Sequence, residues 1–168
     1  MLKAIRRFFD RHLAPAAGGR GAPGDRGGRG EEASLRLATA ALLVEALQAD
    51  HQVDPRELEA VRELLEGFFG LGREEAAELL ALARREAEEA VSLFQFTRLV
   101  DRGYDPATKE RIVEMLWRVA YADGHKHHWE EHLVRKVAEL LHVPHGAFVR
   151  ARERAARERH PGGGGPTG

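Results

Sequence analysis

Hydrophobic residues recur at helical spacing along most of this chain, and short breaks rich in Gly, Pro or Asp separate the helical segments. The stretch over residues 31–50 is apolar almost throughout and too long for a strand, so it predicts a central buried helix. No segment alternates with a period of two, and we therefore expect no sheet. Six further apolar stripes predict helices from Asp54 to Gly70, over 73–89, from Leu93 to Gly103, from Asp105 to Asp123, over 133–141 and over 147–159. The pattern predicts an all-α fold, a single bundle of about seven helices.

The helix that opens at Asp54 has the clearest start signal. Asp54 stands at the cap position, Pro55 at the first helical position and Glu57 three residues after the cap. A cap residue that accepts backbone N–H groups and an acid that reaches back to the cap together form a capping box, and Pro fits the first helical position. A second Asp-Pro pair, at residues 105–106, predicts another helix start.

The charge distribution divides the chain into a basic leader and an acidic body. Residues 1–30 contain seven Lys or Arg and two Asp, so the net charge of −1 combines +5 in this part with −6 in the rest. Residues 1–13 predict a short basic amphipathic helix, 14–30 a flexible Gly-, Arg- and Pro-rich linker, 31–160 the helical domain and 161–168 a disordered tail. No apolar run reaches the roughly 18 to 20 residues of a membrane span, and the cations of the leader interrupt any secretory signal. We expect a cytoplasmic protein, with a peripheral position at the inner membrane face as the alternative.

Composition and motifs exclude several kinds of chemistry. The chain has no cysteine, which excludes disulfides, thiolate nucleophiles and cysteine-based zinc sites. We find no nucleophile elbow, P-loop or dinucleotide fingerprint. His128 and His132 stand four residues apart, but Trp129 rather than Glu follows the first histidine, so the metalloprotease element lacks its base. We predict that the protein is not an enzyme; an enzyme would need the histidines of residues 125–132 to converge with Asp123 in a pocket.

An internal repeat relates the two halves of the chain. A shift of 73 residues places residues 49–57 on residues 122–130, with His127 in the position of Asp54. In both copies an apolar helix leads into Ala-Asp, a short turn, a polar cap position and a second apolar helix. We predict two helix-turn-helix halves that pack as a pseudo-symmetric pair.

The repeated element resembles the hallmark of the TerB-like family, which is named from bacterial tellurite-resistance proteins and carries Ala-Asp-Gly-x-x-Asp-x-x-Glu twice. Residues 122–130 match this pattern except at His127, and residues 49–57 match it except for the Gly. The likeness covers about residues 32–158. It implies an all-α bundle, a link to tellurite resistance and wider chemical stress, and acidic turns that form a divalent-cation site.

The acids of the two turns are the candidate metal ligands. If the helix junctions meet, their carboxylates could share one cation, since calcium and magnesium bind several oxygen atoms. Participation of His127 would admit zinc, manganese or iron instead. A purely structural role is the alternative, because helix caps and helix stops account for most of these residues. The candidate set is Asp50, Asp54, Glu57, Asp123, His127 and Glu130.

The charge pattern and the resemblance together predict the partners. We expect a non-enzymatic, stress-linked binding module with a protein partner. Residues 2–13 place an apolar stripe beside cations and could bind an anionic membrane surface weakly and reversibly, with docking onto the protein's own bundle as the alternative. A membrane-surface scaffold that acts through this leader is the alternative function. Residues 26–30 hold Arg and Gly without interleaved aromatics, so we do not expect nucleic acid.

Overall fold

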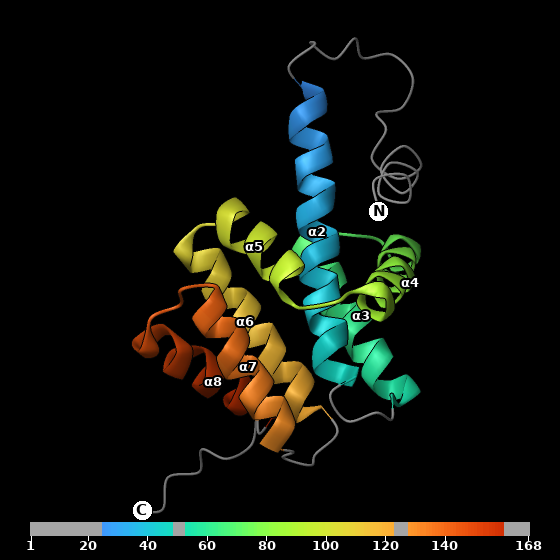
Figure 1. Cartoon of the computed structure of the whole chain (residues 1–168). Helices are drawn as coiled ribbons and strands as arrows, with labels where there is room; N and C mark the ends of the chain where they lie inside the picture. The colour runs from blue at the N-terminus through green and yellow to red at the C-terminus, as the bar shows by residue number, and fades with distance from the viewer. Residues whose placement is uncertain (1–24, 49–52, 123–127, 160–168) are drawn as a thin grey trace, which may run out of the picture.

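The computed structural model describes residues 25–48, 53–122 and 128–159, and all the regular elements in these ranges are α-helices (Figure 1). The prediction of an all-α bundle with seven helices is therefore confirmed for the described part of the chain. None of these helices is long and apolar enough to cross a bilayer. The helices are α2 (Asp25–Gln48), α3 (Pro55–Phe69), α4 (Arg73–Glu89), α5 (Phe94–Gly103), α6 (Pro106–Tyr121), α7 (His128–Leu140) and α8 (His145–Arg159).

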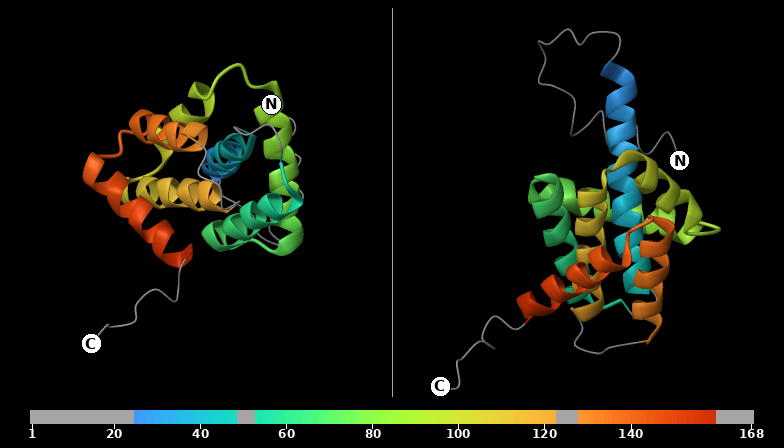
Figure 2. Two further views of the ribbon diagram at one scale, coloured as in Figure 1. Left: turned by 90° about the horizontal axis from the view of Figure 1, so that it is seen from below. Right: turned by 90° about the vertical axis from the view of Figure 1, so that its left-hand side faces the viewer.

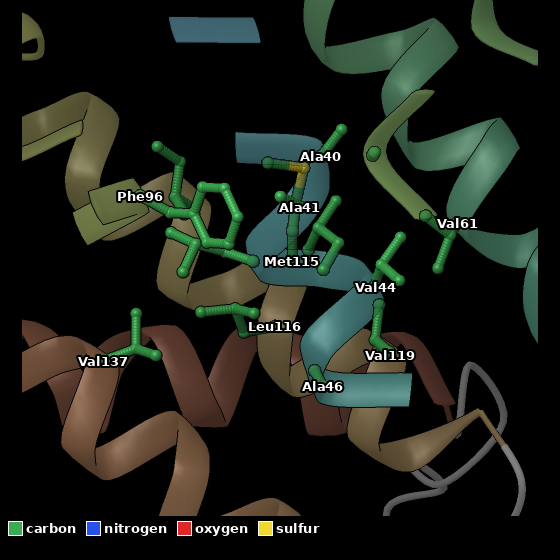
Figure 3. Packing of buried hydrophobic residues seen from close by; sticks show 14 of the residues in the cluster. Ala40, Ala41, Val44, Ala46, Val61, Phe96, Met115, Leu116, Val119 and Val137 are labelled. Atoms are coloured by element: carbon green, nitrogen blue, oxygen red, sulfur yellow. The ribbon is translucent and has the colours of Figure 1, made fainter. Parts of the chain in front are cut away.

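Helix α2 forms the centre of the bundle. Viewed along its axis, it is surrounded by the other helices, and it contacts α3, α4, α5, α6 and α7 (Figure 2). Its apolar stretch explains this position, because a helix that is hydrophobic on all sides is buried on all sides. Small residues allow α2 and α6 to approach each other closely. Ala40 and Ala41 of α2 are fully buried, and Figure 3 shows them beside Met115 of α6.

Helix α8 packs against α6 on the side of the bundle away from α2. Its apolar face is buried, and Phe148 lies against Trp117 of α6 with the ring centroids 5.5 Å apart. Glu110 of α6 accepts hydrogen bonds from Arg150 at 3.1 Å and Arg154 at 3.3 Å. Apolar contact and ion pairs thus hold α8 on α6.

The start and stop signals that mark two of the helices are confirmed. Asp54 caps α3 with a complete capping box, and Asp105 caps α6 by accepting the N–H of Thr108 at 2.8 Å. Gly70 ends α3 in the left-handed conformation, with a φ of 65°. Glycine suits this position because it has no Cβ to clash with the following carbonyl group.

The structure corrects one boundary of the predicted linker. Residues 25–30, which we expected in the flexible linker 14–30, form the first turns of α2. They contain no apolar residue and extend the helix beyond the rest of the bundle (Figure 1), so hydrophobic periodicity could not reveal them. The predicted leader helix over 1–13 and the tail over 161–168 lie outside the described residues. The pseudo-symmetric relation between the two halves stays a prediction.

Candidate functional site: two helix junctions at one end of the bundle

The helices that flank the two acidic turns end at the same end of the bundle. The C-terminal ends of α2 and α6 and the N-terminal ends of α3 and α7 all lie at the lower end in Figure 1, and the side view in Figure 2 agrees. Helix α2 contacts both α6 and α7, and α3 contacts α6. We call this region, made of the last turns of α2 and α6 and the first turns of α3 and α7, the acidic corner.

The capping box at the start of α3 accounts for two of the predicted ligands. Oδ1 of Asp54 accepts the backbone N–H of Arg56 at 2.9 Å, and Oε2 of Glu57 accepts the backbone N–H of Asp54 at 3.0 Å. Glu57 is buried, with 7% of its surface exposed. Both carboxylates therefore satisfy N–H groups that would otherwise lack partners at the helix start, a role that requires no cation.

The other predicted ligands fall where the structure gives no side-chain contacts. Asp50, Asp123 and His127 lie outside the described residues, and Glu130 belongs to α7 but its side chain is not described. Among the residues that are described, no group of three or more His, Asp or Glu side chains could hold a metal ion. The structure thus brings Asp54 and Glu57 together and leaves the rest of the set a prediction.

Glu45 is an acid of the acidic corner that the sequence reading missed. It lies in the last turn of α2, and partial burial raises its pKa. The C-terminal end of a helix carries partial negative charge, which disfavours a carboxylate there as well. A cation bound nearby would relieve both effects, because it stabilises the charged form. The sequence did contain one indication of Glu45. It and Arg36 are the two charged residues between Leu35 and Leu47, a stretch that is otherwise almost entirely apolar.

A groove of about 290 Å³ lies between α3 and α6. At one side the guanidinium group of Arg111 lies over the Phe68 ring, 4.7 Å from its centroid, and Glu114 pairs with Arg118 at 2.8 Å. The lining contains two glutamates and two arginines, so the charge of the groove favours neither anions nor cations. The lining residues are Glu63, Leu64, Gly67, Phe68, Arg111, Glu114, Met115 and Arg118.

These features define a class of protein: an all-helical bundle built around one central helix, with two acidic helix junctions at one end. The family model described as "Tellurite resistance protein TerB" matches residues 36–153, which is more than half of the 168-residue chain. The chain belongs to the TerB family, and the resemblance seen in the sequence is confirmed. Tellurite resistance is an association of the family as a whole. Neither the curated proteins nor the solved structures gave a match.

Proposed function

We propose that this TerB-family chain is a non-enzymatic module that binds one divalent cation at the acidic corner and engages a partner protein there under tellurite or other chemical stress. The observation that carries the proposal is that the helices flanking both acidic turns end at the same end of the bundle (Figures 1 and 2). Four helix ends at one end of the bundle are the arrangement that a single ion shared by both turns would require. The proposed ligands are drawn from Asp50, Asp54, Glu57, Asp123, His127 and Glu130, with Glu45 beside them.

The chemistry of the donors fits a hard cation. Five of the six predicted ligands are carboxylates, and calcium and magnesium are bound by oxygen ligands. Carboxylates gathered at the corner in this way would repel each other, so a divalent ion there would offset both this repulsion and the partial burial of Glu45. The single imidazole, His127, shifts the preference toward zinc or manganese if it binds the ion.

A non-enzymatic role is supported by the residues that the chain lacks. It has no cysteine and none of the nucleophile, phosphate-loop or dinucleotide motifs sought in the sequence. His132, the second histidine of the incomplete metalloprotease element, is exposed on α7. Because Trp129 rather than Glu follows His128, the element also lacks the general base that metalloproteases use.

Calorimetric titration of the full chain with magnesium, calcium, manganese and zinc, one at a time, tests the cation site. The double variant Asp50→Asn with Asp123→Asn should weaken binding by roughly tenfold or more, because affinity depends on the number of charged ligands. Asp105→Asn is the matched control: it makes the same chemical change at the cap of α6, at the end of that helix away from the corner. Absence of binding for all four ions, or equal affinity in the wild type and the double variant, would contradict the proposal.

His127→Asp tests which ion the site prefers. An aspartate restores the acid of the family pattern, so we expect the affinity for calcium and magnesium to rise and that for zinc to fall. Unchanged affinities for all four ions would exclude His127 from the ligand set and leave the carboxylates as the only donors to test.

A further inference from the structure

The exposed large apolar side chains of the described residues are concentrated in one short segment. Val91 in the α4–α5 loop is 99% exposed, and Phe94 and Leu99 of α5 are 61% and 40% exposed. The loop lies at the edge of the molecule in both views of Figure 2. Exposed apolar side chains that cluster in this way mark an interaction surface, whereas scattered ones do not.

Two arginines share the exposed face of α5. Arg98 and Arg102 follow Phe94 at intervals of four residues, so the three side chains lie along one side of the helix, and both arginines are exposed. Neither forms an ion pair with another described residue. Asp101, the acid of the same helix, is bonded to Lys109 at 2.7 Å and does not neutralise them. We call Val91, Phe94, Arg98, Leu99 and Arg102 the α5 surface.

We propose that the α5 surface binds an anionic lipid bilayer. Val91 and Phe94 enter the boundary between head groups and acyl chains, while Arg98 and Arg102 meet lipid phosphates. The opposite face of α5 is buried in the bundle, so the α5 residues of the surface face outward. This inference does not depend on the proposed cation site.

The shape and size of the α5 surface favour a bilayer over a protein partner. Its most exposed apolar residue stands on a protruding loop, and a fluid bilayer accommodates a protruding side chain without needing a matching cavity. A stable protein interface uses roughly 20–30 residues a side. Three apolar side chains and two arginines are too few for such an interface, and two copies of this chain would bring like charges together.

The predicted basic leader is a second candidate for binding the same bilayer. Gly103 at the end of α5 lies against Leu35, in the half of α2 that is nearer to the leader. Two weak sites on one chain bind a surface more tightly than either does alone. A background variant with Ile5→Ser and Phe9→Ser disrupts the apolar stripe of the leader and isolates the contribution of the α5 surface.

Site-specific fluorescence gives the first test. Because the chain has no cysteine, Val91→Cys places a single environment-sensitive nitrobenzoxadiazole dye on the loop, and Ala77→Cys places it on the exposed side of α4 as a control. With vesicles of phosphatidylcholine and phosphatidylglycerol, we expect the emission to move to shorter wavelength for the loop dye and to stay unchanged for the α4 dye. Unchanged emission at both sites would overturn the proposal and point to a protein partner.

Vesicle flotation with the leader background gives the second test. Arg98→Gln with Arg102→Gln should lower the partition coefficient on phosphatidylglycerol-containing vesicles by roughly thirty-fold, since each surface cation contributes to binding. Arg84→Gln with Arg85→Gln, on exposed positions of α4, makes the same charge change and should have a much smaller effect. Equal losses for the two pairs would mean that net charge alone drives binding and would overturn the proposal.

A third test removes negative charge beside the loop. Glu88 and Glu89 are exposed in the last turn of α4, next to the loop, where they repel an anionic surface. Glu88→Gln with Glu89→Gln should therefore strengthen binding to phosphatidylglycerol-containing vesicles and leave binding to pure phosphatidylcholine unchanged. Weaker binding of this variant to the anionic vesicles would contradict the proposed orientation.

Discussion

Two substitutions at Asp54 separate its capping role from its charge. Asp54→Ala removes the oxygen that accepts the Arg56 N–H at 2.9 Å, whereas Asp54→Asn keeps an oxygen acceptor in the same place. Loss of such a cap costs about 1 kcal/mol, while Asn caps about as well as Asp. For a chain of this length, that loss lowers the Tm by about 2–4 °C. We expect a lower Tm for Asp54→Ala and little change for Asp54→Asn.

Thermal unfolding followed by far-ultraviolet circular dichroism, in buffer with a chelator, measures both variants. Equal destabilisation by the two substitutions would refute the capping account, because it would show that the charge of Asp54 rather than its acceptor stabilises the fold. Repetition with a saturating divalent cation extends the test, since a bound ligand raises the Tm according to its concentration and affinity. If Asp54 is also a ligand, Asp54→Asn reduces this cation-dependent rise while keeping the Tm of the metal-free protein.

Three further substitutions test the packing and the electrostatics. Gly67→Ala adds a methyl group in the last turn of α3 that meets nothing within 4 Å, so the urea midpoint should rise by the equivalent of at most about 0.5–1 kcal/mol. A fall would mean that the helix end needs glycine there. Gly103→Ala places the new Cβ 2.2 Å from a methyl carbon of Leu35, so it should lower the free energy of unfolding by about 1–3 kcal/mol. An unchanged urea midpoint would show that Leu35 repacks freely. The hydrogen bond from Lys109 lowers the pKa of Asp101 below its ordinary value of 3.8. The ionised carboxylate therefore stabilises the folded protein above pH 3.8, and this stabilisation is lost as the pH falls through the lowered pKa. Asp101→Asn should therefore lower the Tm at neutral pH and approach the wild type in strong acid; a constant difference at every pH would exclude this linkage.

Local chemistry made the helices predictable. The caps at Asp54 and Asp105 and the stop at Gly70 depend on residues within one helical turn, so their patterns can be read directly from the sequence. The central position of α2 followed from its lack of a polar face. The first turns of α2, over residues 25–30, escaped prediction because a helix that extends beyond its packed part leaves no hydrophobic pattern.

The surfaces were harder to predict, because they depend on how distant segments are brought together. Glu45 is a single charge in an apolar run, and its burial follows from the helices that surround α2. Phe94 belongs to the apolar stripe that predicts the helix from Leu93 to Gly103, yet both Phe94 and the neighbouring Val91 are exposed. Hydrophobic spacing identifies the faces that can be buried, and only the packing decides which of them is covered.

The two proposed surfaces should act independently. Gly103, at the C-terminal end of α5, lies against Leu35, while the acidic corner begins at the last turn of α2, roughly 15 Å further along that helix at 1.5 Å per residue. Sites so far apart without shared partners usually contribute additively. We therefore expect the double variant Asp50→Asn with Asp123→Asn to bind phosphatidylglycerol-containing vesicles as the wild type does, with or without a divalent cation. If a cation strengthens vesicle binding in the wild type but not in the double variant, the corner itself faces the bilayer and the independent arrangement is wrong.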